Sequence, residues 1–300
     1  EIYYTSGATM SNNMAISGYL NKHSDAIFIT SSVEHNDIMI LAKKYNGIII
    51  NVNSDGYINF QELEKVLEEN KDKKILCSFQ MANSETGVIQ DIKRISKLVH
   101  LYDAVLHTDA TQYIPYFQID LNKLNIDMLS MSGQKIGCIK GIGLLYKKKD
   151  IDIEPLIYGE QGLIGGTENV IGIGCLGEAF KYLDYNYSDT ILKRDMLIKL
   201  LDGKLIGTHF NRLPNNINIL LKGVDSEKMQ YILNANEIWV SGGSACSSGS
   251  GKPSHVIMAM GYSEEDAKSC IRITLPKDIS EAEIEYISKV ININYKMMKG

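Results

Sequence analysis

Residues 74–108 read KILCSFQMANSETGVIQDIKRISKLVHLYDAVLHT. The short apolar runs at 74–79 and 104–108 have the length and composition of buried strands. Between them, the apolar residues of 92–101 recur at helical spacing. A strand, a helix and a second strand in this order favour a mostly parallel sheet that is covered by helices.

The same alternation extends to both sides of this stretch. Further strand-like runs lie at 26–30, 47–52, 127–131 and 141–146, and further helical patterns lie at 10–20 and 59–68. We therefore expect an α/β domain over residues 1–180. In such a sheet, ligands bind beyond the carboxyl ends of the strands, where the loops converge.

The pattern changes in the last third of the chain. It predicts one long helix over 170–201, a strand at 217–221, and helices at 226–235 and 280–298. We expect residues 181–300 to form a linking helix and a smaller α+β domain. A Gly/Ser-rich segment at 241–251 has the composition of a linker, but Cys246 stands in its middle.

Composition narrows the class of protein. The chain has 31 basic and 36 acidic residues, a net charge of −5 and 44% hydrophobic residues, which predicts a soluble globular protein that does not bind nucleic acid directly. No apolar run approaches the roughly 20 residues of a membrane span. Five cysteines without a C-x-x-C pair indicate neither a disulfide framework nor a metal site, and they fit a reducing, cytoplasmic setting.

The first residues lack the charged and apolar regions of a signal peptide. The chain also begins inside an apolar stretch, as if an N-terminal part were missing.

Three features beside the expected strands and helices have residue types that can take part in binding or catalysis. The run TSGAT at 5–9 directly precedes the helical pattern at 10–20, and it is either a simple N-cap or an anion site. Asp109 follows the strand at 104–108, either as a turn-capping acid or as a partner for a cationic ligand. Lys135 follows the strand at 127–131 and, taken alone, is a surface lysine. Together, a phosphate site, an acid and a lysine are what pyridoxal 5'-phosphate (PLP) requires.

Further motifs are spread over almost the whole chain. They are Thr5-Ser6-Gly7-Ala8-Thr9 with Asn12-Asn13, Glu34-His35, Asn83 with Glu85 and Gly87, Asp109-Ala110-Thr111-Gln112, Ser132-Gly133 with Lys135, Gly166-Thr167, and Gly243-Ser244-Ala245-Cys246. In their order and spacing these motifs resemble the cysteine desulfurases, which are fold-type I PLP enzymes. The resemblance implies a mostly parallel, seven-stranded sheet, a smaller C-terminal domain and conversion of L-cysteine to L-alanine.

The resemblance also implies a set of residues around the cofactor. Lys135 would hold PLP covalently, Asp109 would pair with the pyridinium nitrogen, and Gln112 would donate a hydrogen bond to the phenolic oxygen. His35 would stack on the ring as a catalytic residue. The groups that would grip the phosphate are Ala8, Thr9, Ser132 and Gln134.

Other matched positions imply contacts with the substrate and with a second subunit. Asn83 would lie beside the ring near the substrate carboxylate, which Arg272 would clamp with two parallel hydrogen bonds. Thr167 would reach the phosphate of a neighbouring subunit, which implies a homodimer.

Cys246 is flanked by Ser, Gly and Ala, without an apolar neighbour to bury it. In the family, this cysteine attacks the sulfur of the substrate and carries it as a persulfide. The length of the Gly/Ser-rich segment resembles the branch that hands sulfur to iron–sulfur scaffold proteins or to tRNA-thiolation enzymes. Cys77 and Cys175, in contrast, lie in apolar segments where burial is expected to keep a thiol inert.

Three departures from the family pattern keep alternatives open. Gln134 stands where the family usually has a histidine, Ile164 stands where an arginine is common, and the family's N-terminal segment has no counterpart before Glu1. One alternative is another PLP reaction of the same fold, such as transamination or selenocysteine cleavage. A second is a degenerate desulfurase that binds partners without turnover.

Overall fold

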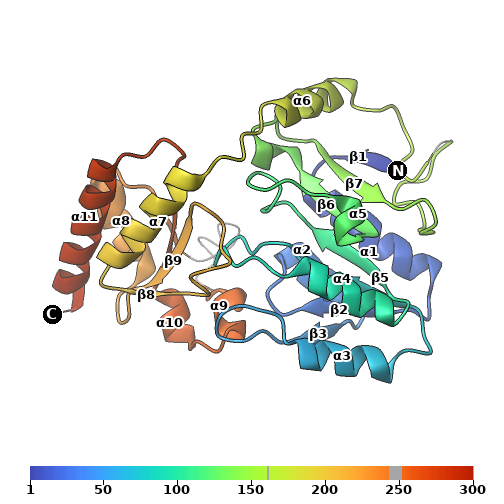
Figure 1. Cartoon of the computed structure of the whole chain (residues 1–300), viewed down its shortest axis with the longest axis horizontal. Coiled ribbons are helices and arrows are strands. Elements are labelled where there is room, and N and C mark those ends of the chain that lie inside the picture. Colours follow the sequence, from blue (N-terminus) through green and yellow to red (C-terminus); the bar gives the residue numbers. More distant parts are fainter. Residues whose placement is uncertain (161, 243–251, 300) are drawn as a thin grey trace. The chain divides into compact units, whose positions relative to one another are not determined.

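The structure is a computed structural model that describes residues 1–160, 162–242 and 252–299 (Figure 1). The chain divides into two compact units. Unit 1 comprises Glu1–Asn51, Ile58–Ala82 and Gln90–Tyr185, and unit 2 comprises Val52–Tyr57, Asn83–Ile89 and Asn186–Gly300. Two short segments from within the first hundred residues therefore belong to the same unit as the C-terminal part.

Unit 1 contains a seven-stranded sheet. In spatial order its strands are β1 (Ile2–Thr5), β7 (Gly143–Lys147), β6 (Met128–Ser132), β5 (Val105–Asp109), β4 (Ile75–Ser78), β2 (Ile27–Ser31) and β3 (Ile48–Ile50). The five strands from β6 to β3 are mutually parallel, whereas β7 is antiparallel to both β6 and β1. The predicted α/β fold with a mostly parallel sheet of seven strands is confirmed.

The helices of unit 1 are α1 (Ala8–Lys22), α2 (Asn36–Lys44), α3 (Phe60–Glu69), α4 (Ile92–Leu101), α5 (Leu121–Leu124), the 3₁₀ turn η1 (Gly133–Ile136) and α6 (Val170–Lys181). Four of them, α3 to α6, begin at an Asn or Asp side chain that caps the first turn. Asn59 and Asp91 accept backbone N–H bonds at the starts of α3 and α4, as N-cap side chains do. Met14 and Ile16 of α1 are fully buried in the core of this unit.

The prediction of one helix over 170–201 is wrong. The structure has two helices there, α6 in unit 1 and α7 (Ser188–Leu200) in unit 2. The residues between them read YLDYNY, and aromatic residues, Asp and Asn all have low helix propensity. The apolar residues in this stretch continue the helical spacing, but the helix ends at Lys181 and a second helix begins at Ser188 in the other unit.

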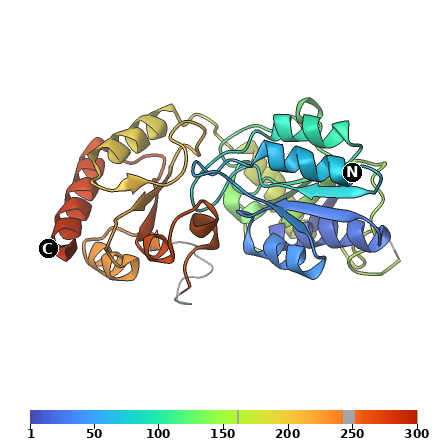
Figure 2. The same cartoon turned by 90° about the horizontal axis from the view of Figure 1, so that it is seen from below.

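Unit 2 is built on a four-stranded antiparallel sheet. Its spatial order is β10 (Ser241–Gly242), β11 (Cys270–Thr274), β9 (Asn216–Leu220) and β8 (Lys204–Leu205). Its helices are α7, α8 (Ser226–Ala235), α9 (His255–Ala259), α10 (Glu264–Lys268) and α11 (Glu281–Lys299). Helix α11 lies alongside α7 in both views (Figures 1 and 2).

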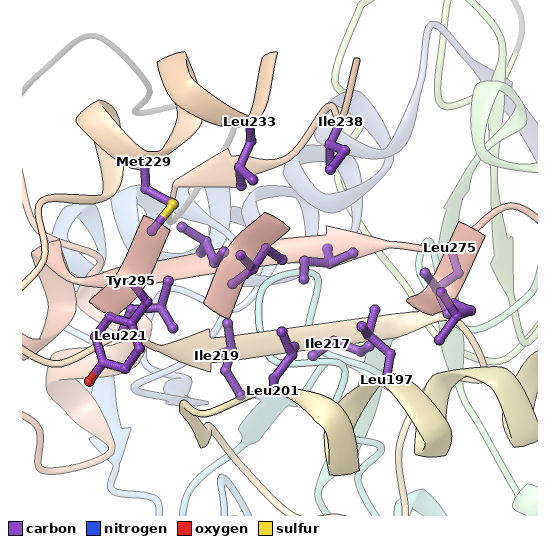
Figure 3. Packing of buried hydrophobic residues seen from close by; sticks show 14 of the residues in the cluster. Leu197, Leu201, Ile217, Ile219, Leu221, Met229, Leu233, Ile238, Leu275 and Tyr295 are labelled. Atoms are coloured by element: carbon purple, nitrogen blue, oxygen red, sulfur yellow. The ribbon is translucent and has the colours of Figure 1, made fainter. Parts of the chain in front are cut away.

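Alternate residues of β9 carry the core of unit 2. Ile217 and Ile219 are fully buried, and they belong to one apolar cluster with Leu197 of α7, Leu233 of α8 and Tyr295 of α11 (Figure 3). Helices thus cover one face of this sheet with apolar side chains. Among the helices in the described part of the chain, none is both long and apolar enough to cross a membrane.

Candidate active site

The turn between β1 and α1 is held against the end of β6. Gly7 has φ 148°, a value that favours glycine. A Cβ on Gly143 of β7 would lie 2.7 Å from the Cα of Gly7 and 2.5 Å from the carbonyl oxygen of Met131, so only glycine fits there. A Cβ on Gly7 would lie 3.6 Å from Oγ of Ser132. The structure therefore brings the Ser132 hydroxyl to the start of α1.

The start of α1 has the properties of an anion site. Ala8 and Thr9 stand in the first turn of this 15-residue helix, where backbone N–H groups lack intrahelical partners and the helix dipole is positive. The first turn contains no acid. Oγ of Thr5 lies 3.1 Å from the carbonyl oxygen of Gly7 and 2.8 Å from Oγ of Ser11, which fixes the turn. Phosphate suits such a position.

Asp109 and Lys135 follow adjacent parallel strands at the same end of the sheet. Asp109 is the last residue of β5 and pairs with Ser130 of β6, as the neighbouring strands in Figure 1 show. Lys135 stands in η1, three residues beyond Ser132, and its side chain is exposed together with that of Gln134. Gln112 lies partly exposed in the turn after β5.

Asp109 is a buried acid in neutral hydrogen-bonding surroundings. Only 8% of the residue is exposed, and its two oxygens accept bonds of 2.9 Å from Nδ2 of Asn12 and from the backbone N–H of Thr111. Burial raises the pKa of Asp109, although these hydrogen bonds work in the opposite direction. Within the described residues Asp109 has no ion-pair partner. A cationic N–H group such as a pyridinium would supply the missing charge.

His35 and Asp37 stand at the start of α2. Nδ1 of His35 lies 2.8 Å from Oδ1 of Asp37, and Nδ2 of Asn12 donates to Oδ2 of Asp37 at 3.2 Å. Burial works to raise the pKa of Asp37, but hydrogen bonds from His35, Asn12 and Thr9 outweigh it and hold that pKa below its ordinary value. No local sequence pattern distinguishes Asp37, apart from its place two residues after His35. Asn12 was part of a matched motif without an assigned role.

Glu34 is a second buried acid close to this group. Oγ of Ser31 donates to Oε1 at 2.5 Å, and the backbone N–H of Gln80 donates to Oε2 at 2.9 Å. Burial raises the pKa of Glu34 to about 8, and the charges of Asp109 and Asp37 add to this effect. Glu34 is therefore largely protonated at neutral pH.

Unit 2 brings together the two residues predicted to bind the substrate. Oδ1 of Asn83 accepts hydrogen bonds from the backbone N–H groups of Glu85 and Thr86 at 2.9 and 2.8 Å. These bonds stabilise the turn that begins at Asn83. Nη1 of Arg272 donates to the carbonyl oxygen of Ser84 in the same turn at 3.1 Å. The predicted contacts of Asn83 and Arg272 with substrate stay predictions.

The described residues on either side of the segment 243–251 contact β11 and the turn that contains Glu85. Before this segment, Ser241 of β10 pairs with Arg272 of β11. After it, Oγ of Ser254 donates to Oε2 of the buried Glu85 at 2.5 Å. Cys246 itself lies outside the described residues.

The remaining predicted positions lie in unit 1. Thr167 is exposed between Gly166 and the start of α6, and Ile164 is partly buried. The burial expected for cysteines holds for Cys77 but not for Cys175, which is half-buried because it lies on the side of α6 between its buried and exposed residues. No group of three or more His, Cys, Asp or Glu side chains in the described part is arranged to hold a metal ion.

Comparisons with known proteins identify the family of this chain. Residues 1–287 match the family described as aminotransferase class-V. The cysteine desulfurase IscS of Methanosarcina thermophila is 36% identical over 310 residues, which cover 97% of this chain and 76% of that protein. A cysteine desulfurase of a Nostoc species is 35% identical with the same coverage.

Solved structures give the same result. The X-ray structure of a NifS-like protein from Rickettsia africae superposes with a TM-score of 0.87 at 29% identity, covering 99% of this chain and 82% of that one. A structure of SspA in complex with cysteine superposes with a TM-score of 0.78 at 30% identity, covering 92% of this chain and 81% of that one. This chain thus spans about three quarters or more of the length of these relatives.

Proposed function

This chain belongs to the aminotransferase class-V family and, within it, to the PLP-dependent cysteine desulfurases, and we propose that it carries the sulfur of L-cysteine as a persulfide on Cys246. The predicted enzyme class and the predicted cofactor are confirmed by this membership. The roles of the individual residues are proposals.

The observation that carries the proposal is the grouping of three features at one end of the sheet. The start of α1 with Ser132, the buried acid Asp109 and the exposed Lys135 all stand there. They fit PLP, because the first would bind the phosphate, the second would face the pyridinium nitrogen and the third would hold the cofactor covalently. When bound, the cofactor supplies the electron sink that makes the substrate Cα–H acidic.

The further cofactor contacts that we propose come from exposed or partly exposed side chains. His35 would lie against the ring, Gln112 would donate to the phenolic oxygen, and Ala8, Thr9 and Gln134 would complete the phosphate site. Gln134 can donate a hydrogen bond to phosphate but carries no charge. We propose that Arg272 and Asn83 hold the substrate carboxylate.

The sulfur transfer that we propose balances without an added oxidant. The Cys246 thiolate attacks the sulfur of the substrate, an S–S bond forms and the substrate Cβ–S bond breaks. The released electron pair stays on the substrate carbon and takes up a proton, which gives alanine. His35 is the proposed side chain for moving protons at the substrate, since an imidazole nitrogen can both accept and donate a proton.

A homodimer is part of the proposal. Helix α6 exposes the apolar side chains of Val170, Ile171 and Phe180, and Tyr182, which follows directly, is also exposed. Thr167 stands just before this helix. We propose that a second copy of the chain covers these exposed residues and that Thr167 contacts the cofactor phosphate of that copy.

The sulfur acceptor that we propose is a protein, either an iron–sulfur scaffold or a tRNA-thiolation enzyme, in a reducing cytoplasm. The proposal as a whole is tested by incubating the purified protein with PLP and L-cysteine. We expect a visible absorbance band and equal amounts of alanine and, with a reductant, sulfide. Bound PLP without alanine would favour the degenerate desulfurase, and pyruvate or amino-group transfer would favour another class-V reaction.

A further inference from the structure

Asp37 lies in the centre of a group of polar side chains from three elements. Its side chain is only 9% exposed, and it is the second residue of α2. Oδ1 faces Nδ1 of His35 at 2.8 Å and the backbone N–H of Ile38 at 2.8 Å, and Oδ2 accepts from Asn12 of α1 at 3.2 Å. Both oxygens are therefore used by donors.

The contact with Asp37 settles which nitrogen of His35 carries a proton. A carboxylate only accepts hydrogen bonds, so Nδ1 must be the donor, and in a neutral ring the lone pair then resides on Nε2. The His35 side chain is 43% exposed and makes no side-chain cap on α2 although it occupies the N-cap position. Nε2, on the far side of the ring from Nδ1, is thereby the atom prepared to accept a proton.

Asn12 extends the connection to Asp109. Its Nδ2 amide donates to Oδ2 of Asp37 at 3.2 Å and to Oδ2 of Asp109 at 2.9 Å. Rotating this amide by 180° would turn its oxygen toward two carboxylates, so the orientation is determined by its acceptors. Oδ1 of Asn12 is buried and has no partner among the described residues, which agrees with an orientation imposed from the Nδ2 side.

We propose that Asp37 is a positioning residue of the desulfurase reaction, which fixes the Nδ1–H form of His35 and ties that imidazole through Asn12 to Asp109. This inference rests on the proposed roles of His35 and Asp109 at the cofactor. The four side chains would then hold the group against the ring and the group at the ring nitrogen in one fixed arrangement. The simpler alternative is that Asp37 only stabilises the start of α2 by its charge.

A positioning role and a purely structural role of Asp37 predict different tautomers of His35. NMR of the full chain with ¹⁵N-labelled histidine measures the tautomer. We expect Nδ1–H in the wild type at an alkaline pH at which the ¹⁵N shifts show a neutral ring, both before and after PLP is added. In Asp37→Ala the Nε2–H form should become populated, and Asp37→Asn, which keeps one accepting oxygen, should lie between. His100 is an internal reference, since its Nε2 lies 2.8 Å from Asp127 in the same unit and should not change.

A kinetic readout tests whether the reaction uses this tautomer. Alanine formation by Asp37→Ala should lose about 10–100-fold in kcat, because a misplaced proton-transfer group acts on the chemical step, while KM changes by no more than about two-fold. Asp152→Ala is the matched control, since Asp152 forms an exposed ion pair with Lys22 at 3.0 Å in the same unit. It should behave like the wild type.

Each result decides the inference. An Nε2–H tautomer in the wild type, or a tautomer unchanged in Asp37→Ala, would overturn the positioning role. A shifted tautomer with an unchanged kcat would show that the reaction does not use Nε2 of His35, and would overturn it as well. If the wild type released no alanine, desulfuration would fail as the function, yet the tautomer measurement would still decide what Asp37 does to His35.

Discussion

Nδ2 of Asn12 donates a hydrogen bond of 2.9 Å to Oδ2 of Asp109, a residue 97 positions later in the chain. The first helix thereby fixes the orientation of the acid at the end of β5. The backbone N–H of Thr111 holds the other oxygen. The carboxylate is thus set in place by the protein itself, which is the condition for an electrostatic effect that needs no rearrangement during the reaction.

Replacing this acid by its amide should separate cofactor binding from turnover. In Asp109→Asn, PLP should still bind, because Lys135 and the start of α1 are unchanged. Alanine formation should fall by about 100-fold or more, because a neutral amide cannot stabilise a protonated pyridinium. Visible absorbance measures the first quantity and alanine release the second. A variant with a near wild-type rate would remove Asp109 from this role.

The covalent attachment point is tested by chemical trapping. Borohydride reduction of the PLP-loaded protein should label the peptide that contains Lys135, and Lys135→Ala should abolish the label. Lys140→Ala is the matched control, because Lys140 is also exposed and only five residues away. A label on another lysine, or none with PLP in excess, would contradict the assignment.

Glu34 should make the folded protein less stable as the pH rises. Its pKa is about 8 in the folded state against an ordinary value of 4.5, so between these values only the unfolded chain releases the proton. The stabilisation is complete below pH 4.5, falls by roughly 1 kcal/mol per pH unit above it, and is lost above about pH 8. Urea unfolding over this range should show the slope in the wild type.

The variant Glu34→Gln should remove this pH dependence of the free energy of unfolding. The amide has nearly the same shape as a protonated carboxyl group and can form hydrogen bonds, but it does not titrate. Glu69→Gln on the exposed side of α3 is the control and should keep the pH dependence. Equal pH dependence in the wild type and in Glu34→Gln would show that Glu34 does not stay protonated in the folded protein.

The exposed apolar residues of α6 predict a dimer that an added charge should break. Ile171 is 78% exposed in the single chain, and Ile171→Asp would place a charge in the proposed interface. Analytical ultracentrifugation should find a dimer in the wild type and a monomer in this variant. Leu101→Asp, at a similarly exposed position at the end of α4, should remain dimeric.

Cofactor retention gives a second measurement on the same interface. If Thr167 contacts the phosphate of the neighbouring subunit, Thr167→Ala should lose PLP faster on dialysis while the dimer persists. A wild-type protein that sediments only as a monomer would contradict both the interface and the shared phosphate site.

The parts of the fold that depend on a local pattern of apolar residues could be predicted from the sequence. The run at 104–108 became β5, and the alternation of strands and helices predicted that Asp109 and Lys135 each stand at or beyond the end of a strand. Asp37 could not be found in this way, because its importance depends on α1 lying beside α2, which no local pattern specifies. The break after α6 was missed because apolar spacing in YLDYNY continued the helical period without helix-favouring residues.

The burial of the other cysteines determines which of them can serve as controls for Cys246. Burial raises the pKa of Cys77 far above its ordinary value and that of Cys270 to about 12, so both thiols stay protonated and inert. Cys138 and Cys175 are half-buried and are the other thiols of the described chain that reagents could reach. Cys138→Ser and Cys175→Ser are therefore the matched controls for Cys246→Ser.

The variant Cys246→Ser should separate substrate binding from sulfur removal. Addition of L-cysteine should still change the visible absorbance, because the proposed binding residues Lys135, Asp109 and Arg272 are unchanged, but alanine release should stop because the proposed nucleophile is gone. Mass spectrometry of the wild type after a single turnover should find one extra sulfur on the peptide that contains Cys246, and the two control variants should retain it there. Full alanine production by Cys246→Ser would end the persulfide mechanism. Bound PLP with no extra sulfur on any cysteine would instead favour a chain that binds partners without turnover.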